Sequence, residues 1–237
     1  MSTELNNILI TGATRGVGEA LTLRFAQQGR KVFALARTQQ QLDALVQRGG
    51  SGVIPYSVDI SNLEALETAI NEIESDHGGV DVLINNAGIV QNIEFANQDI
   101  EVMNRILDVN LKGTLFCTRL TVPHMIERKR GRILNISSVA GVRGIFGQAA
   151  YCASKHGMNG FADALAQELI PHNIGVATIC PGGIDTPLWD KETNPYPGDI
   201  DKTIRPSEVV DMVEFLLKQP VGTMYKRIVV FPTNEWH

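Results

Sequence analysis

The stretch Asn7-Ile8-Leu9-Ile10-Thr11-Gly12-Ala13-Thr14-Arg15-Gly16-Val17-Gly18 decides the fold of this 237-residue chain. Its apolar run 8–10 predicts a short buried strand. An amphipathic helix is expected from Glu19 to Gln28, with Gly29 ending it. A strand, a Gly-rich turn and a helix in this order predict a site for the phosphates of a dinucleotide, because glycines let the backbone come close and the helix N-terminus offers free N–H groups. The spacing is Gly-x-x-x-Gly-x-Gly, which differs from the Gly-x-Gly-x-x-Gly of the general fingerprint.

The rest of the chain alternates short apolar runs with amphipathic segments. Further strands are expected at 31–36, 53–58, 80–84, 132–136, 175–180 and 227–231. Helices are expected at about 38–48, from the capping box Ser61-Asn62-Leu63-Glu64 to His77, at 99–128 with a break around Pro123, at 150–170, and at 207–218 with Ser207 as cap. The alternation predicts an α/β fold, a Rossmann-type doubly wound sheet of seven parallel strands with helices on both faces. No linker divides the chain, so 1–237 is expected to form a single domain.

Composition excludes several classes of function. A formal net charge of -5 argues against nucleic acid or an anionic membrane as the main partner. No apolar run approaches the roughly 20 residues of a membrane span, and the N-terminus lacks a secretory signal, so a cytoplasmic protein is expected. The three cysteines lie in apolar segments, which is typical of reduced, buried thiols. No group of cysteines and histidines has the spacing of metal ligands, so no metal is expected.

Tyr151 and Lys155 lie four residues apart near the start of the helix expected over 150–170. Residues i and i+4 share one face of a helix, so the phenol and the ammonium group point the same way. A tyrosine has a pKa of roughly 10, and a nearby cation lowers that pKa by favouring the phenolate. The pair therefore suits a general acid or base. The alternative is an ordinary amphipathic helix with a chance tyrosine and lysine.

Four motifs occur together between about residues 8 and 186: the turn Thr11–Gly18, the segment Asn85-Asn86-Ala87-Gly88, Ser138, and Tyr151-x-x-x-Lys155. In order and spacing they resemble the short-chain dehydrogenase/reductase family. The resemblance implies an oxidoreductase that transfers a hydride between NADP(H) and a carbonyl or alcohol substrate, such as a ketone, an aldehyde or a 3-oxoacyl group. The alternative is an NADP(H)-binding regulatory protein without significant turnover, against which the intact Ser138, Tyr151 and Lys155 argue.

The resemblance assigns roles to four residues. Ser138 would bond the substrate carbonyl oxygen, and Tyr151 would donate a proton to that oxygen during reduction. Lys155 would hold the nicotinamide ribose and lower the pKa of the tyrosine. Asn110 would hold, through its backbone, a water in a proton relay to the lysine. For Asn110 a plain polar residue that kinks the helix is an equal alternative.

Cofactor choice is expected at the end of the second strand. An acidic residue there would bind the adenosine ribose 2′-hydroxyl of NAD, but this chain has Ala36 followed by Arg37. A guanidinium group suits a 2′-phosphate, and Arg15 offers a second cation, so NADP(H) is expected. The alternative is that both arginines are solvated surface residues.

The remaining cofactor contacts follow from the resemblance. Asp59 would contact the adenine amino group, unless it caps a helix. The segment 86–88 would lie along the adenosine ribose or steady the sheet, and Thr186, in the segment 181–186, would bond the nicotinamide carboxamide. The full expected set is Gly12, Thr14, Arg15, Gly16, Val17, Gly18, Arg37, Asp59, Ile60, Asn86, Ala87, Gly88, Tyr151, Lys155, Pro181, Gly182, Ile184 and Thr186.

The substrate pocket is expected to be apolar, with Arg143 as an exception in its wall. Its wall would include Val139, Ile145, Phe146, Leu188 and Trp189. The last two lie in the polar, proline-containing loop 185–205, which is expected to be partly disordered without ligand and to close over the substrate. Permanent packing of Trp189 is the alternative.

Two features bear on partners. The basic run Arg128-Lys129-Arg130 is expected to complement a helix C-terminus, with docking of an acidic acyl carrier protein as the alternative. The family resemblance implies a homo-oligomer, a dimer or tetramer. The ending Phe231–His237 departs from the Gly-rich ending of many members, so the family's C-terminal subunit contacts are not carried over.

Overall fold

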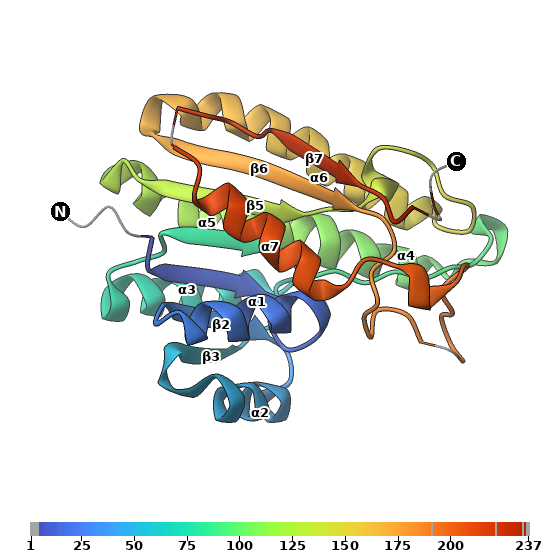
Figure 1. The fold of residues 1–237 in the computed structure, drawn as a ribbon, viewed down its shortest axis with the longest axis horizontal. Coiled ribbons are helices and arrows are strands. Elements are labelled where there is room, and N and C mark those ends of the chain that lie inside the picture. The colour runs from blue at the N-terminus through green and yellow to red at the C-terminus, as the bar shows by residue number, and fades with distance from the viewer. Residues whose placement is uncertain (1–4, 191, 221, 234, 236–237) are drawn as a thin grey trace.

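Seven parallel strands form one open sheet in the part of the chain that the structure, a computed structural model, describes (residues 5–190, 192–220, 222–233 and 235). Their order is β3-β2-β1-β4-β5-β6-β7 (Figure 1). The strands are β1 (Asn7–Thr11), β2 (Lys31–Ala36), β3 (Val53–Ser57), β4 (Val82–Asn85), β5 (Gly131–Ile136), β6 (Ile174–Pro181) and β7 (Arg227–Val230). The order reverses between β1 and β4, and such a point opens a crevice at the carboxyl ends of the strands.

Helices cover both faces of this sheet. The first face carries α1 (Gly16–Gln27), α2 (Gln39–Gly49) and α7 (Pro206–Leu217). The second carries α3 (Leu63–His77), α5 (Gly113–Arg128) and α6 (Ala149–Leu169), and α4 (Ile100–Leu107) packs against α6. The expected Rossmann-type, doubly wound fold is therefore confirmed.

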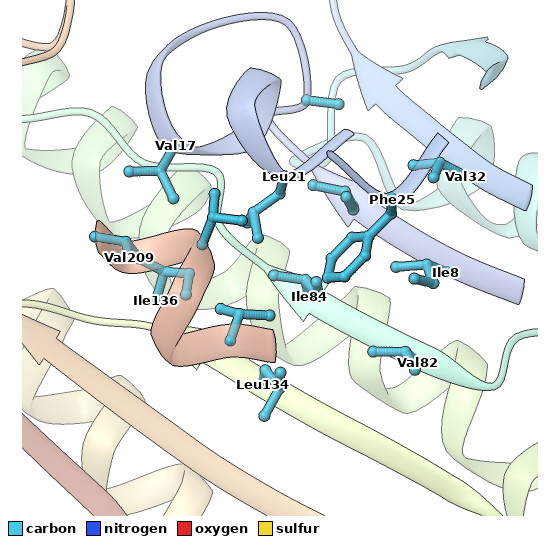
Figure 2. Close-up of a cluster of buried hydrophobic side chains, with 14 of the residues drawn as sticks. Ile8, Val17, Leu21, Phe25, Val32, Val82, Ile84, Leu134, Ile136 and Val209 are labelled. Atoms are coloured by element: carbon cyan, nitrogen blue, oxygen red, sulfur yellow. The ribbon is translucent and has the colours of Figure 1, made fainter. Parts of the chain in front are cut away.

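Side chains of one strand alternate between the two hydrophobic layers. Ile8 of β1 packs on the first face and Leu9 on the second, because successive residues of a strand point to opposite sides. Figure 2 shows Leu21 and Phe25 of α1 directed toward the sheet, where Ile8 and Ile84 lie. Each large apolar side chain that is fully buried here contributes about 1.5–3 kcal/mol. Burial on both faces explains why the strands are near-continuous apolar runs.

The long helical region breaks at a different place from the one expected. Helix α5 continues through Pro123, and the interruption is a π-helical turn, Asp108–Lys112, between α4 and α5. A proline inside a helix removes one backbone hydrogen bond, but Thr121 and Met125 on either side stay buried and hold the helix in place. The π-turn lies where Asn110 points inward, which is typical of functional sites.

Two helix starts also differ from expectation. Asn62, not Ser61, caps α3: its side chain accepts a hydrogen bond from the Ala65 N–H (3.1 Å). Helix α7 begins at Pro206, and Glu208 accepts a hydrogen bond from the Arg205 N–H (2.7 Å), so Ser207 lies inside the helix. Proline fits the first helical position because its fixed φ suits the helix and its missing N–H is not needed there.

The basic run after α5 is engaged within the chain. Arg128 pairs with Glu74 (2.7 Å) and donates to the Val80 carbonyl (3.0 Å), and Arg130 pairs with the buried Asp81. These contacts favour the intramolecular role over docking of a partner. Among the described residues, none of the helices has both the length and the apolar character needed to cross a membrane.

Candidate active site

A cavity of about 600 Å³ opens at the carboxyl ends of the strands. Most of the residues predicted for the cofactor and substrate line it: Gly12, Thr14, Arg15, Gly16, Val17, Arg37, Asp59, Ile60, Asn86, Ala87, Gly88, Ser138, Val139, Ile145, Tyr151, Lys155, Pro181, Gly182, Ile184, Thr186, Leu188 and Trp189. Gly18, Asn110 and Phe146 do not. Segments far apart in the sequence therefore meet in one space.

The Gly-rich turn forms one end of the cavity. Gly12 and Gly16 have φ values of 65° and 55°, and a Cβ on Gly12 would lie 2.8 Å from the Cα of Ala87. Larger residues would be strained there and would fill the cradle. Helix α1 receives no side-chain hydrogen bond from its N-cap residue Arg15, so the first N–H groups of the helix are available to an anion. This geometry fits the pyrophosphate of a dinucleotide.

Gly18 has a different role from the contact expected of it. A Cβ at this position would collide with the carbonyl oxygen of Gly12, and Gly18 is buried behind the turn. It permits helix α1 to pack tightly against the turn and does not face the cavity.

Asn86 holds the turn to the end of β4. Its side-chain amide donates to the carbonyl oxygens of Thr11 (3.0 Å) and Gly12 (3.1 Å). In return, the Thr11 hydroxyl accepts from the backbone N–H groups of Asn86 and Ala87. The segment 86–88 therefore steadies the end of the sheet, which was one of its two expected roles, and it also lines the cavity.

Two arginines gather at the end of β2. Arg15 and Arg37 both line the cavity, next to Ala36, Thr38 and Gln41. Both side chains are exposed, and partial burial and the nearby charge of Arg37 lower the pKa of Arg15. No ion pair joins either arginine to another described residue. Two adjacent cations without an acidic partner form a site suited to a phosphate.

Asp59 is held on both sides of its carboxylate. It accepts hydrogen bonds from the Ser61 N–H (3.0 Å) and hydroxyl (2.7 Å), and from Arg105 of α4 (2.7 Å). Burial raises the pKa of Asp59, but the hydrogen bonds from Ser61 and Arg105 and the charge of Arg105 outweigh it, so the pKa lies below its usual value. The carboxylate is ionised and oriented, and the helix cap is Asn62 instead.

Tyr151 and Lys155 project from the first turns of α6 into the same cavity. They are 8% and 2% exposed, and the Lys155 ammonium group donates to the Ile136 carbonyl (3.0 Å). Burial raises the pKa of Tyr151 to about 12 and lowers the pKa of Lys155 to about 8. The expected lowering of the tyrosine pKa by lysine is therefore not found in this geometry, because removal from water disfavours the phenolate more strongly.

Ser138 lies at the end of β5, where the chain enters a short 3₁₀ turn, Val139–Gly141. Its hydroxyl accepts a hydrogen bond from the Ala140 N–H (3.1 Å). A hydrogen bond between Ser138 and Tyr151 opposes the effect of burial on the pKa of Tyr151. The serine and tyrosine hydroxyls thus converge on one point of the cavity.

Asn110 ties three segments together from inside the π-turn. Its side chain accepts from the Ile89 N–H (2.8 Å) and donates to the Ile89 carbonyl (2.9 Å) and the Ser154 hydroxyl (3.1 Å). It is fully buried and does not line the cavity. A Cβ on Gly88 would lie 3.5 Å from the Asn110 amide oxygen and 3.7 Å from the Lys155 ammonium, so the asparagine and lysine are near neighbours. The water relay through its backbone stays a prediction.

The segment after β6 runs beside the Gly-rich turn. A Cβ on Gly16 would lie 3.0 Å from the Thr186 methyl group. The Gly182 N–H donates to the Val230 carbonyl (2.7 Å), which fixes the segment to β7. The cavity is therefore lined by the Gly-rich turn, by Tyr151 and Lys155, and by this segment. A dinucleotide and a small substrate need such a continuous site.

Comparison with known proteins agrees with this geometry. Residues 6–196 match the family model described as short chain dehydrogenase. The chain belongs to the short-chain dehydrogenase family. Members are NAD(P)-dependent oxidoreductases, and this chain is an enzyme that acts on small carbonyl or alcohol substrates with NAD(P)(H).

This short-chain dehydrogenase is similar in sequence or structure to three individual proteins. It is 36% identical over 217 residues to a 3-oxoacyl-[acyl-carrier-protein] reductase of Thermotoga maritima, a match that covers 88% of each chain. A metagenomic short-chain oxidoreductase in complex with NADP is 30% identical, with a TM-score of 0.83 over 98% of this chain and 99% of the other. A 3-ketoacyl-(acyl-carrier-protein) reductase from Brucella melitensis complexed with NADH is 29% identical, with a TM-score of 0.89 over 98% and 99%.

The substrate end of this short-chain dehydrogenase has a mixed wall. Val139, Ile145 and Leu188 supply apolar surface. Phe146 is 84% exposed and points away from the cavity. The structure therefore does not place Phe146 in the wall, and the left-handed backbone of Gly147 (φ 74°) follows directly after it.

The wall also contains residues that the sequence did not single out: Gln148, Tyr196, Asp199 and Glu235. Tyr196 carries a local signal, an aromatic residue in an otherwise polar loop. The acidic residues carry none, since acidic side chains are ordinary on surfaces. No group of three or more His, Cys, Asp or Glu side chains is arranged to hold a metal ion within the described ranges.

The loop after Thr186 is tied to the segment that follows β4. The Asn194 amide oxygen accepts from the Asn92 N–H (2.9 Å), and its amide nitrogen donates to the Val90 carbonyl (3.3 Å). Trp189 packs edge-to-face on Tyr196, with ring centres 5.1 Å apart, and is half-buried. The described part of the loop thus borders the cavity and contains a short 3₁₀ turn, Ile200–Lys202.

Proposed function

We propose that this short-chain dehydrogenase is an NADPH-dependent ketoreductase whose substrates are ketones, aldehydes or 3-oxoacyl groups. The observation that carries the cofactor preference is the pair Arg15 and Arg37, two neighbouring cations at the end of β2 with no acidic partner among the described residues. A 2′-phosphate would neutralise both, whereas the 2′-hydroxyl of NADH would leave them uncompensated. A carboxylate, the group that suits NADH, is replaced by Ala36.

The proton chemistry of the proposed reaction belongs to three side chains. When bound, NADPH supplies the hydride. Ser138 donates a hydrogen bond to the substrate carbonyl oxygen, and Tyr151 transfers its phenolic proton to that oxygen as the carbonyl carbon gains the hydride, so the product is the alcohol. Burial raises the pKa of Tyr151 to about 12. The phenol is therefore fully protonated at neutral pH and ready to act as the acid.

Lys155 stabilises the charge that this transfer leaves behind. Its pKa is lowered by burial to about 8, so most of the ammonium form persists at pH 7. The cation lies 5.7 Å from the centre of the Tyr151 ring. It favours the phenolate formed in the transition state more than the neutral phenol before it, and such differential stabilisation lowers the barrier. Asn110 positions this part of α6 through Ser154.

The substrate class rests on the wall and on the relatives. Apolar side chains such as Val139, Ile145 and Leu188 suit the hydrocarbon part of a substrate. The Thermotoga maritima relative is a reductase of 3-oxoacyl groups on acyl carrier protein. These two points support a 3-oxoacyl thioester or a simple ketone as substrate.

We also propose that the enzyme is a homo-oligomer. Strand β7 forms one edge of the sheet, and Val229 on it is 44% exposed. An open apolar edge of this kind is normally covered. Sedimentation of the full chain distinguishes a monomer, which would contradict this part of the proposal, from a dimer or tetramer.

Steady-state kinetics test the function. Oxidation of NADPH and of NADH is followed at 340 nm with ethyl acetoacetate, acetoacetyl thioesters and simple aliphatic ketones. We expect turnover with at least one of these substrates and a higher kcat/KM with NADPH than with NADH. Binding of NADPH without turnover of any carbonyl compound would favour the regulatory alternative.

A further inference from the structure

Glu235 lies in the cavity although it comes 52 residues after the segment that it contacts. Both of its carboxylate oxygens accept a hydrogen bond from the Gly183 N–H, each at 3.1 Å. Gly183 stands between Gly182 and Ile184, which line the same wall. The carboxylate therefore sits directly on the segment predicted to hold the nicotinamide.

The chain after β7 is held in place by several contacts. The Val230 carbonyl accepts from the Gly182 N–H (2.7 Å), and the Pro232 carbonyl accepts from the Glu235 N–H (3.0 Å). The Arg143 guanidinium lies 4.9 Å from the centre of the Phe231 ring. Folding back in this way brings the end of the chain onto the cavity that the same chain forms.

A phenol accompanies the carboxylate. A Cβ on Gly183 would collide with both the Tyr196 hydroxyl and a carboxylate oxygen of Glu235. The two polar groups therefore flank the same backbone atom, and both line the cavity. They form a polar part of a cavity wall that also contains apolar residues such as Val139.

The charge of Glu235 has little compensation. No ion pair joins it to any lysine, arginine or histidine in the described part of the chain. Arg143 lines the same cavity, but its guanidinium lies against Phe231 and not within ion-pair distance of Glu235. Among the described residues, the Gly183 N–H is the hydrogen-bond donor to this half-buried carboxylate, whose negative charge borders the cavity, where screening by water is weaker than at an open surface.

We propose that the negative charge of Glu235 makes the substrate end of the cavity discriminate between neutral and negatively charged substrates. Carbonyl compounds with a neutral substituent, such as esters and thioesters, are accepted, and free oxo acids are repelled by the like charge. The inference rests on the proposed ketoreductase function and deepens it, because it names which form of a 3-oxoacyl compound is taken.

The test compares two substrates that contain the same ketone, one as a neutral ester and the other as a free acid. Ethyl acetoacetate and acetoacetate are reduced with saturating NADPH by the wild type and by Glu235→Gln. Glutamine keeps an oxygen that can accept from Gly183 and removes only the charge. We expect kcat/KM for acetoacetate to rise about tenfold in the variant, while the value for the ester changes less than about threefold. Asp201→Asn, at an acidic and exposed position in the loop 185–205 and outside the cavity wall, should change neither value.

A binding measurement keeps the result independent of turnover. Calorimetry with 3-hydroxybutyrate and its ethyl ester, each added to the complex with NADPH, a combination of two reduced compounds that cannot react, should show the same selective gain for the acid in Glu235→Gln. An equal change for acid and ester would mean that Glu235 only positions Gly183, and no change for either compound would mean that its charge is not sensed. Either result overturns the inference. Absence of turnover with every ketone, with the selective gain in binding retained, would instead overturn the proposed function.

Discussion

The Lys155 ammonium nitrogen lies 5.7 Å from the centre of the Tyr151 ring and donates its hydrogen bond to the Ile136 carbonyl, 3.0 Å away. The lysine is thus anchored to β5 and acts on the phenol through space. Burial keeps Tyr151 protonated in spite of this nearby cation. In the proposed mechanism, the lysine therefore stabilises the phenolate only as it forms in the transition state.

Replacement of Tyr151 by Phe should abolish most turnover. The phenyl ring fills the same buried space, so the fold and NADPH binding should persist, while the proton donor is lost. We expect kcat to fall by roughly 10²–10⁴-fold, the range typical of a general acid. Ketone-dependent NADPH oxidation and titration of NADPH fluorescence measure the two quantities. Tyr56→Phe, on β3 and outside the cavity wall, is the matched control. Retention of more than a tenth of the wild-type kcat would remove Tyr151 from its role.

Lys155→Met should reveal the free-energy cost of burying the ammonium group. Burial lowers the pKa of Lys155 to about 8, against 10.5 when the side chain is in water. Between these values the unfolded chain binds more protons at this position than the folded chain, so the stability of the wild type should rise with pH relative to the variant. At pH 7 and below, both states are mostly protonated at this position, and the difference between the two proteins should be nearly constant.

The expected size of this change is about 2 kcal/mol between pH 8 and pH 10, since one pKa unit corresponds to about 1.4 kcal/mol. Urea unfolding of wild type and variant at pH 7, 8, 9 and 10 measures it. Titration of Tyr151, whose pKa is raised to about 12, affects stability mainly at higher pH. A difference in stability that does not vary across this range would show that the folded lysine titrates normally.

Arg37→Asp should shift cofactor preference toward NADH. The carboxylate would repel a 2′-phosphate and could accept a hydrogen bond from the 2′-hydroxyl of NADH. Loss of a charge-assisted contact of roughly 1.5–3 kcal/mol should move the ratio of kcat/KM values by about tenfold or more. The exposed Arg119 on α5 lies outside the cavity wall, so Arg119→Asp should leave the ratio unchanged. A wild-type enzyme that prefers NADH would contradict the assignment without any mutation.

Trp189 should report closure of the loop 185–205 over the substrate. It is half-buried against Tyr196 and lines the cavity, so a ligand at the substrate end would exclude more water from the indole ring. The chain has one other tryptophan, Trp236, which lies outside the described residues. In a Trp236→Phe background, emission should shift to the blue or be quenched when an unreactive alcohol analogue is added to the complex with NADPH.

The additional change on adding the analogue is the deciding signal, because NADPH itself quenches tryptophan by energy transfer. Emission that is already blue-shifted and ignores the analogue would support permanent packing of Trp189. The contacts of Asn194 with Asn92 and Val90 already hold the loop near the cavity. Closure is therefore expected to be a small movement.

Local patterns in the sequence determined the sheet and the chemical groups of the site. Strand β2 is found at the predicted residues 31–36, and α3 ends at His77 with Gly78 in the left-handed region. The Gly-rich turn, Ser138 and the pair Tyr151 and Lys155 could also be recognised from their spacing. Such features depend on backbone conformation, on runs of apolar residues and on i to i+4 geometry, all of which act between residues close in the chain.

Tertiary packing decided the rest. Neighbouring turns carry α5 through Pro123, and Phe146 is left exposed instead of lining the cavity. Burial by the surrounding elements raises the pKa of Tyr151, against the effect of a nearby lysine. Glu235 reaches Gly183 only because the chain folds back after β7. Desolvation and long-range contacts depend on every element packed around a side chain, so the short stretch of sequence that carries the side chain does not contain them.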